Sequence, residues 1–231
     1  MDGEKTKRSA RARKVWLTLI FPFLIVIALV AWFALTQIEN RVRSDMAESL
    51  QTVVQATHES LLIWVEYQKS HLAQVTADSE ILDLTTRILD VPATPNGLLG
   101  SESQSELRRY FIQRRDRFGD VGFFIISPER INLASMRDTN VGATNLIEEQ
   151  RPELLKRAFE GETVFVPPIR SDVQLRDDSG QLVQQAPTMF VAAPIQDETG
   201  RAIAVLTIRL DPARDFSRLT QVGRIGESGG V

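Results

Sequence analysis

The sequence predicts a mixed α+β protein in which a transmembrane helix and a long amphipathic helix precede an antiparallel sheet flanked by helices. Three observations carry this prediction. Residues 15–35 contain no charged side chain, residues 37–73 contain neither glycine nor proline, and apolar segments joined by short polar turns follow later in the chain. These patterns are typical of a membrane span, of an amphipathic helix with apolar residues three and four apart, and of antiparallel strands.

Charge and composition narrow the possible functions. The chain of 231 residues has a formal net charge of −3 and no cysteine, which excludes disulfides, thiolate metal sites and a cysteine nucleophile. Up to Lys14 there are six basic and two acidic side chains, so the tail is basic while the rest of the chain is acidic. Because an apolar run follows the tail directly, the tail indicates a membrane topology and not a nucleic-acid partner.

The run "VWLTLIFPFLIVIALVAWFAL" at residues 15–35 is predicted to cross a membrane once, since about 20 helical residues span the hydrocarbon core. A cleaved signal peptide is the alternative, but Trp32 and Phe33 stand where a cleavage site needs small residues. The positive-inside rule places residues 1–14 in the cytoplasm. We therefore expect a single-pass protein of the inner (plasma) membrane, with the rest of the chain in the periplasm or extracellular space.

Residues 36–90 are expected to form a long extracytoplasmic helical region, with a second helix near "SEILDLTTRIL". The apolar stripe of the long helix needs a partner. Close to the membrane, a second copy of the chain is the simplest partner, and packing against the chain's own domain is the alternative. We expect the lower part to form a homodimer and the upper part to cover the domain.

Residues 91–222 contain the predicted sheet and its flanking helices. The segment "VPATPNGLLGSES" is typical of a loop, and Ser103 followed by Glu106 predicts a capping box that opens a helix. The segments "VGFFIIS", from Val121, and "INLASM", from Ile131, are expected to pair as a hairpin across a short polar turn.

The second half of this region continues the alternation of helix and strand. A short helix is predicted to begin at Pro152 and to end at Gly161. The segment "TVFV" is expected to be a short strand closed by Pro167 and Pro168. Two polar segments around "DDSG" could form a projecting hairpin. The strands "PTMFVAAPI" and "RAIAVLTIRL" are joined by the turn "QDETG", and "PARDFSRLT" is predicted as a short helix capped by Asp211.

The segment Gly226–Gly230, "GESGG", matches the G-x-S-x-G pattern of serine hydrolases. A nucleophile elbow needs a strand before the serine, a helix after it and a later histidine, and the only histidines are His58 and His71 on the long helix. No P-loop or metal-binding pattern is present, and Asp177 and Asp178 suit a turn better than a carboxylate pair. We therefore expect no enzyme and no cofactor, with a serine hydrolase as a distant alternative.

The order of these elements resembles the double Cache family of extracytoplasmic sensor domains. The resemblance rests on "VGFFIISPERINLASM", "EGETVFVPPIRSDV", "PTMFVAAPIQDETGRAIAVLTIRLDP" and "GRIGESGG". It covers roughly residue 41 to the end, and it implies that residues 91–222 form a PAS-like Cache sensor module with an antiparallel sheet. It also implies that residues 223–231 are the junction to a second module, where glycines supply backbone freedom.

The resemblance also suggests where a ligand would bind. Amino-acid-binding members of the family have an Arg-x-Trp-Tyr stretch followed later by an Asp. Here Arg151 stands at the place of the Arg, the Trp and Tyr are absent, and Asp172 lies near the place of the Asp. Arg170 and Arg137 are further candidates for an anionic ligand, since guanidinium groups bind carboxylates in a bidentate manner. The alternative for each arginine is a solvated surface charge.

These features predict the small-molecule-sensing input region of a membrane-anchored bacterial signal-transduction receptor. Its partners would be a small organic ligand, the membrane and a second copy of the chain, with no nucleic acid. In the family, a second module, a second membrane span and an output domain would follow, so the chain is expected to stop before them. The alternative is an extracytoplasmic interaction or scaffold protein that acts through its long helix and binds no small ligand.

Overall fold

The structure is a computed structural model that describes residues 29, 32–33, 36–37, 50–114, 122–176 and 181–210. The chain divides into two compact units, Met1–Ala56 and Thr57–Val231. Every described residue of the first unit is helical. Within the described residues, no helix combines the length and the apolar character that crossing a membrane requires. The predicted span, residues 15–35, lies outside the described residues except for three positions, and the predicted junction after residue 222 lies outside them entirely.

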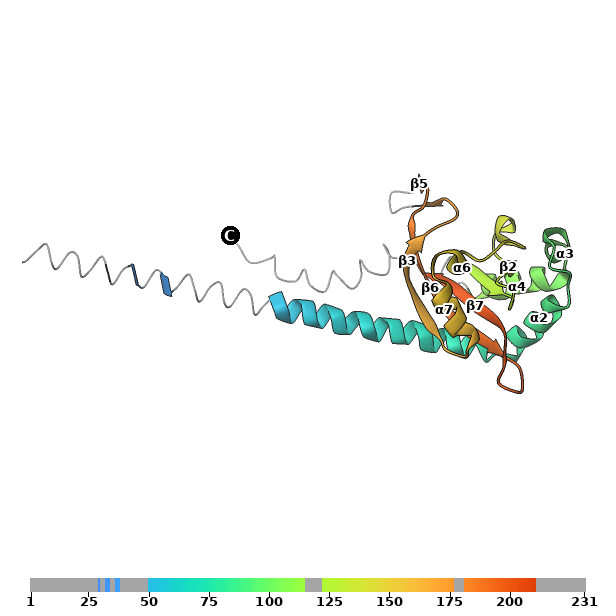
Figure 1. Cartoon of the computed structure of the whole chain (residues 1–231), viewed down its shortest axis with the longest axis horizontal. Helices are drawn as coiled ribbons and strands as arrows, with labels where there is room; N and C mark the ends of the chain where they lie inside the picture. Colours follow the sequence, from blue (N-terminus) through green and yellow to red (C-terminus); the bar gives the residue numbers. More distant parts are fainter. Residues whose placement is uncertain are drawn as a thin grey trace, which may run out of the picture. The chain divides into compact units, whose positions relative to one another are not determined.

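The second unit begins with helical residues 57–76 and continues as a mixture of short helices and strands (Figure 1). Its helices are α2 (Ser79–Leu89), α3 (Pro95–Leu99), α4 (Glu102–Gln113), α6 (Leu146–Gln150) and α7 (Pro152–Phe159), with a 3-10 turn at Asp138–Asn140. Its strands are β1 (Phe123–Ile126), β2 (Asn132–Ser135), β3 (Val164–Arg170), β4 (Leu175–Arg176), β5 (Leu182–Val183), β6 (Pro187–Gln196) and β7 (Ala202–Leu210).

Five strands form one sheet in the order β2-β1-β7-β6-β3, in which every neighbouring pair is antiparallel. β4 and β5 form a separate two-stranded ribbon, which is the predicted projecting hairpin around "DDSG". The central strands β6 and β7 are long and almost entirely buried. The expected mixture of helices with an antiparallel sheet is therefore confirmed, including the two predicted hairpins β1-β2 and β6-β7.

One face of the sheet, which we call the long-helix face, is covered by helical residues 57–76, α2 and α4. Apolar residues of these helices pack in one cluster with alternate residues of the strands. α2 shows why the sequence folds this way, because Ile81, Leu84 and Ile88 recur at helical spacing and are buried, and the side chain of Asp78 caps the first turn. On the long helix, Leu72 and Val75 are buried in the same cluster, which confirms that the upper part of this helix covers its own domain.

The opposite face, which we call the α7 face, is covered by α6 and α7. Leu146, Ile147, Leu155 and Ala158 of these helices form a second buried cluster with the other set of alternate strand residues. α7 begins at Pro152, as predicted. This helix contacts β3, β6 and β7, so the second cluster lies over these three strands (Figure 1). The sheet thus separates two cores of the same domain.

Two predictions about the first helices were wrong in detail. The helix after the loop is capped by Ser101, whose hydroxyl accepts a hydrogen bond from the Gln104 N–H at 3.2 Å, and not by Ser103, which is buried inside the helix. The segment predicted as a loop contains α3, in which Thr94 caps the first turn and Pro95 occupies its first position. The segment contains several serines and prolines close together, and each of them can begin a helix. The sequence pattern alone did not show which of them does.

The prediction that Pro167 and Pro168 close a short strand was also wrong. β3 continues through both prolines to Arg170, and its register with β6 shifts between Val166 and Ile169. A proline cannot donate to the ladder, but β3 is an edge strand, where the missing N–H groups can be accommodated at a bulge. The strand therefore carries Arg170 along the edge of the sheet.

Candidate functional site

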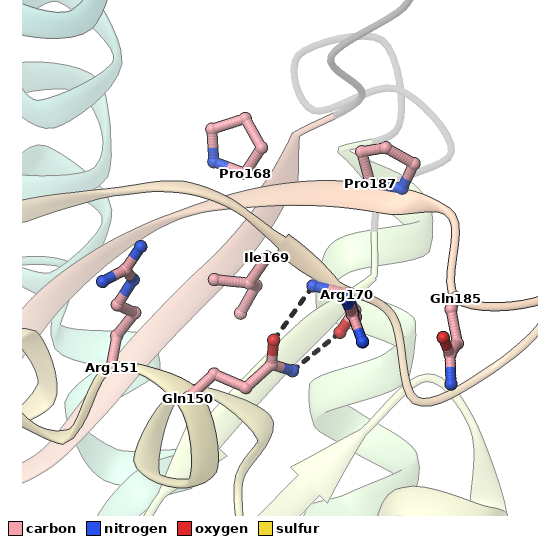
Figure 2. A pocket seen from close by; sticks show the side chains of 7 residues that line it. All are labelled: Gln150, Arg151, Pro168, Ile169, Arg170, Gln185 and Pro187. Atoms are coloured by element: carbon pink, nitrogen blue, oxygen red, sulfur yellow. Dashed lines mark hydrogen bonds between the residues drawn. The ribbon is translucent and has the colours of Figure 1, made fainter.

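A pocket lies at the end of β3, where the chain between α6 and α7 meets the sheet edge (Figure 2). Its volume is about 330 Å³, which is within the range of small-molecule sites. The pocket is lined by Gln150, Arg151, Pro168, Ile169, Arg170, Gln185 and Pro187. This set contains two arginines, Arg151 and Arg170, and no acidic residue.

The side chain of Gln150 fixes the backbone of Arg170. Its Nε2 donates to the Arg170 carbonyl oxygen at 2.8 Å, and its Oε1 accepts from the Arg170 N–H at 3.0 Å, as the dashed lines in Figure 2 show. Because β3 is an edge strand, its outward backbone groups have no neighbouring strand, and the amide of Gln150 takes the place of one. The pocket wall is therefore held at a defined position between α6 and β3.

Two guanidinium groups, those of Arg151 and Arg170, lie at the pocket. Arg151 stands between α6 and α7 in a non-helical conformation, and Arg170 ends β3. Figure 2 shows their side chains on opposite sides of Ile169. Among the described residues, neither side chain has an ion pair or a hydrogen bond, and both residues are exposed. Two predicted site residues thus line one cationic pocket.

The other two predicted residues lie around a third arginine, Arg209 of β7. Oδ1 of Asp172 is 3.9 Å from Nη2 of Arg209, so this carboxylate is engaged with an arginine of its own chain. Arg137 is exposed, and its Nη1 donates to the Gln174 carbonyl oxygen at 3.4 Å. Neither Asp172 nor Arg137 is among the residues that line the pocket. The four predicted residues therefore divide into two pairs.

Arg209 is a residue that sequence reasoning missed. Only 9% of its surface is exposed, and burial, which is the largest influence, lowers the pKa of its guanidinium to about 10. The negative charge of Asp172 acts in the opposite direction, and the positive charge of Arg137 adds to the lowering. The signal was present in the segment "AIAVLTIRL", where an arginine stands in a mostly apolar strand.

Two buried threonines share the α7 face with Arg209. Thr188 on β6 and Thr207 on β7 are fully buried, and neither hydroxyl has a hydrogen-bond partner within the part of the chain that the structure describes. Both were absent from the sequence-based list of candidates, because threonine is common in strands and its partners cannot be known from the sequence. Within the described residues, no group of three histidine, cysteine or acidic side chains is placed to hold a metal ion.

No protein-family model matches the sequence, and no curated protein is significantly similar to it. Several solved structures are similar. The sensor domain of the V. cholerae histidine kinase DctB is 16% identical with a TM-score of 0.49, over 79% of this chain and 59% of that one. The E. coli DcuS sensor domain is 18% identical with a TM-score of 0.34, over 67% of this chain and 96% of that one.

A third similar structure is the ligand-binding domain of the Campylobacter jejuni chemoreceptor Tlp3, solved in complex with L-valine. It is 14% identical with a TM-score of 0.33, over 73% of this chain and 63% of that one. All three are Cache-type sensor domains, the class that the sequence resembles, and they do not distinguish a double from a single Cache. The chain spans less than two thirds of the length of the DctB sensor domain.

Proposed function

We propose that the chain is the extracytoplasmic input region of a membrane-anchored bacterial receptor, and that it senses a small organic ligand at the pocket beside β3. The observation that carries the proposal is the pocket itself, in which the guanidinium groups of Arg151 and Arg170 have no partner among the described residues and no acidic residue is in the lining to neutralise them. Guanidinium groups bind carboxylates and other oxyanions through paired hydrogen bonds. The pocket therefore favours a ligand with negative charge.

The sensing proposal is tested by thermal unfolding of the full chain in detergent with a panel of organic acids, amino acids and amines. A specific ligand at 100 times its dissociation constant adds about 2.7 kcal/mol to the free energy of unfolding. Arg151→Gln and Arg170→Gln should each reduce the melting shift. Arg201→Gln is the matched control, because Arg201 is an exposed arginine in the turn between β6 and β7, at the opposite end of β6 from the pocket residue Pro187.

Three outcomes are informative. A shift that is reduced in both pocket variants and kept in Arg201→Gln supports the site. If the ligand-induced melting shift is unchanged in both pocket variants, the ligand binds elsewhere in the domain. The absence of any shift across the panel contradicts sensing by this region.

Membrane anchoring through residues 15–35 is part of the proposal. The described residues of this segment, Leu29, Trp32 and Phe33, are helical and 62–72% exposed, so these apolar side chains are uncovered in the isolated chain. A lipid environment would cover them. A reporter enzyme fused after Val231 should be active only outside the cytoplasm, and activity in the cytoplasm would contradict the proposed topology.

A homodimer through the long helix completes the proposal. In the first unit, Leu50 and Val54 are 66% and 68% exposed at helical spacing, which is the pattern of an uncovered helix face. Leu50→Glu with Val54→Glu should shift sedimentation toward the monomer. Gln51→Glu, which adds a negative charge at a neighbouring exposed position, should leave the sedimentation unchanged.

A second candidate function is an extracytoplasmic interaction protein that acts through its long helix. It is favoured by the exposure of Leu62, Ile63 and Tyr67 on this helix, at 52%, 71% and 64%. If no compound shifts the melting temperature while Leu62→Glu with Ile63→Glu abolishes self-association, the interaction protein replaces the sensor as the better reading.

A further inference from the structure

The two arginines of the pocket come from separate parts of the chain, and Gln150 connects them. Arg151 follows Gln150 directly, at the junction of α6 and α7. Arg170 ends β3, and its backbone N–H and carbonyl oxygen are both hydrogen-bonded to the side chain of Gln150 (Figure 2). Gln150 is therefore covalently attached to one arginine and bonded to the backbone of the other, so the spacing between the two backbones depends on it.

The backbone of Arg151 is fixed by the two helices that flank it. Its N–H donates to the carbonyl oxygen of Ile147 in α6 at 2.7 Å, and its own carbonyl oxygen accepts from the N–H of Leu154 in α7 at 3.0 Å. Ile147 is fully buried in the cluster of the α7 face, which anchors α6 to the sheet. Arg151 thus has a defined position that does not depend on the Gln150 side chain.

The backbone of Arg170 has weaker support from the sheet. Between the pairs Val166–Phe190 and Ile169–Thr188, β3 advances three residues while β6 advances two, so β3 contains a bulge. The bulge includes Pro167 and Pro168, which have no N–H to donate. Beyond it, only Ile169 and Arg170 of β3 are paired in register with β6. On the outer side of this short paired segment, the Gln150 amide takes the place of a neighbouring strand.

The bulge also decides which way Arg170 faces. Val164 and Val166 pack in the cluster of the α7 face, and regular alternation would place residues 168 and 170 on that same face. Because the bulge adds one residue, Ile169 joins the cluster instead, and Arg170 is exposed at the sheet edge. The bulge therefore turns the arginine out of the core, and Gln150 then holds its backbone there.

The two hydrogen bonds of Gln150 contribute position more than stability. Both are exposed, and an exposed hydrogen bond replaces one that water would make, so its net contribution to folding is small. A guanidinium binds an oxyanion through a planar fork whose direction must match the anion. Holding the backbone from which the fork extends reduces the freedom that a ligand would otherwise have to restrict.

We propose that Gln150 is a positioning residue of the pocket. Its amide fixes Arg170 at a set distance from Arg151, and so sets the length of the anion that both guanidinium groups bind at once. The inference rests on the proposed function, because it names the residue that determines selectivity at the same pocket. Gln150 acts through Arg170 and contributes no charge of its own.

The test titrates the full chain in detergent with inorganic phosphate and with pyrophosphate, and melting shifts give the two dissociation constants. Pyrophosphate has two phosphoryl groups, can contact both arginines and should bind more tightly than phosphate. Gln150→Met keeps the length of the side chain and removes the amide. It should weaken pyrophosphate binding about fivefold or more and phosphate binding about twofold or less. The melting temperature without anion should stay nearly unchanged, because the lost bonds are exposed.

A double-variant cycle tests whether Gln150 acts through Arg170. Arg170→Gln alone should weaken pyrophosphate binding. Adding Gln150→Met to Arg170→Gln should cause no further loss, because the guanidinium that Gln150 positions is then absent. If Gln150→Met weakens pyrophosphate by the same factor with and without Arg170, Gln150 does not act as a positioning residue.

Gln104→Met is the matched control. Gln104 lies on α4, and its Nε2 donates to the carbonyl oxygen of Ser135 at 2.8 Å. Ser135 ends β2, the strand at the opposite edge of the sheet, so the control removes a similar glutamine–backbone bond away from the pocket. This bond is buried, so Gln104→Met should lower the melting temperature. It should leave both dissociation constants and their ratio unchanged.

The outcomes separate this inference from the proposed function. If pyrophosphate binds Gln150→Met as tightly as the unaltered protein, or if Gln104→Met weakens it equally, the role assigned to Gln150 is wrong and the pocket can still be the sensing site. If neither anion binds the unaltered protein, the inference is also wrong, while the panel of organic compounds decides separately whether the chain is a sensor. A loss of the preference for pyrophosphate that is confined to Gln150→Met and Arg170→Gln supports the inference.

Discussion

The two faces of the sheet are built from the same strands and differ in chemistry. On the long-helix face, β6 and β7 contribute only apolar side chains, namely Met189, Val191, Ala193, Ile195, Ala204, Leu206, Ile208 and Leu210. On the α7 face, the same two strands place Thr188, Thr207 and Arg209 among apolar neighbours. Buried polar atoms without partners among the described residues occur on both faces. On the long-helix face they belong to the covering helices, at Thr85 of α2 and Gln104 of α4, whereas on the α7 face they include strand residues of β6 and β7.

The proposed sensing role would require one sheet to serve both stability and recognition. Apolar burial contributes about 25 cal/mol per Å² and needs no partner geometry, so the long-helix face can hold the domain together. A binding surface needs donors that the chain itself does not satisfy, which costs stability. Variants on the two faces should therefore respond differently, and the following changes test this division from the largest expected effect to the smallest.

Phe123→Ala should produce the largest loss. Phe123 is 1% exposed and stacks on Phe111 with ring centres 4.1 Å apart on the long-helix face. Removing a fully buried ring should cost about 3–5 kcal/mol of the free energy of unfolding. Chemical denaturation followed by circular dichroism measures this cost. Ile112→Ala, at a 56% exposed position of the same helix as Phe111, is the control and should cost less than about 0.5 kcal/mol.

Trp64→Ala should have the next largest effect, because it removes the contact of the long helix with the sheet edge. Trp64 is partly buried and packs edge-on against Phe165, with ring centres 6.0 Å apart. We expect a loss of about 2 kcal/mol, below the value for a fully buried aromatic residue. Tyr67→Ala, at a 64% exposed position one turn away, is the control. Equal losses in the two variants would mean that the helix does not cover this face in solution.

Tyr110 provides a pH-dependent test of the long-helix face. Its hydroxyl donates to Oδ2 of Asp78 at 2.9 Å, and burial followed by this hydrogen bond raises the pKa of Tyr110 above its ordinary value. The stabilisation is fully present below about pH 10, where tyrosine of the unfolded chain is protonated, and it is lost as the pH rises further, because the unfolded chain then ionises first.

Tyr110→Phe should accordingly cost about 1.5 kcal/mol at pH 8 through the lost hydrogen bond to a carboxylate. Above about pH 10, the difference in the free energy of unfolding between this variant and the unaltered protein should become smaller. Unfolding curves at pH 8 and pH 10.5 measure both values, with Tyr67→Phe as the control for the loss of one phenol. If this difference in the free energy of unfolding is the same at both pH values, ionisation of Tyr110 does not affect stability as proposed.

Thr207→Val should have the smallest effect and the opposite sign. The valine keeps the shape of a side chain that is 0% exposed and removes a hydroxyl with no partner among the described residues. We expect a gain of about 1 kcal/mol in the free energy of unfolding. A loss of stability would indicate that the hydroxyl is satisfied within the folded domain, and the contrast between the two faces would then be smaller than proposed.

The sequence by itself determined the elements whose signals are local. The hairpins β1-β2 and β6-β7 follow from apolar runs separated by polar turns, and α7 follows from Pro152 at its first position. Arg151 and Arg170 were also found from the sequence, through the resemblance and through the charge pattern, and they line one pocket. The hairpins and the start of α7 depend on neighbours within a few residues, which a single sequence displays directly.

Only the tertiary structure decided which polar groups meet and which remain unpaired. β3 passes through two prolines because it is an edge strand, and its position in the sheet is set by pairing with residues between 17 and 28 positions away. Asp172 is not among the residues that line the pocket with Arg151 and Arg170, and it lies instead beside Arg209, which β7 brings from 37 residues further along the chain. Burial and partner geometry arise from such non-local contacts, so the sequence could name the charged residues but could not show which of them the fold leaves free for a ligand.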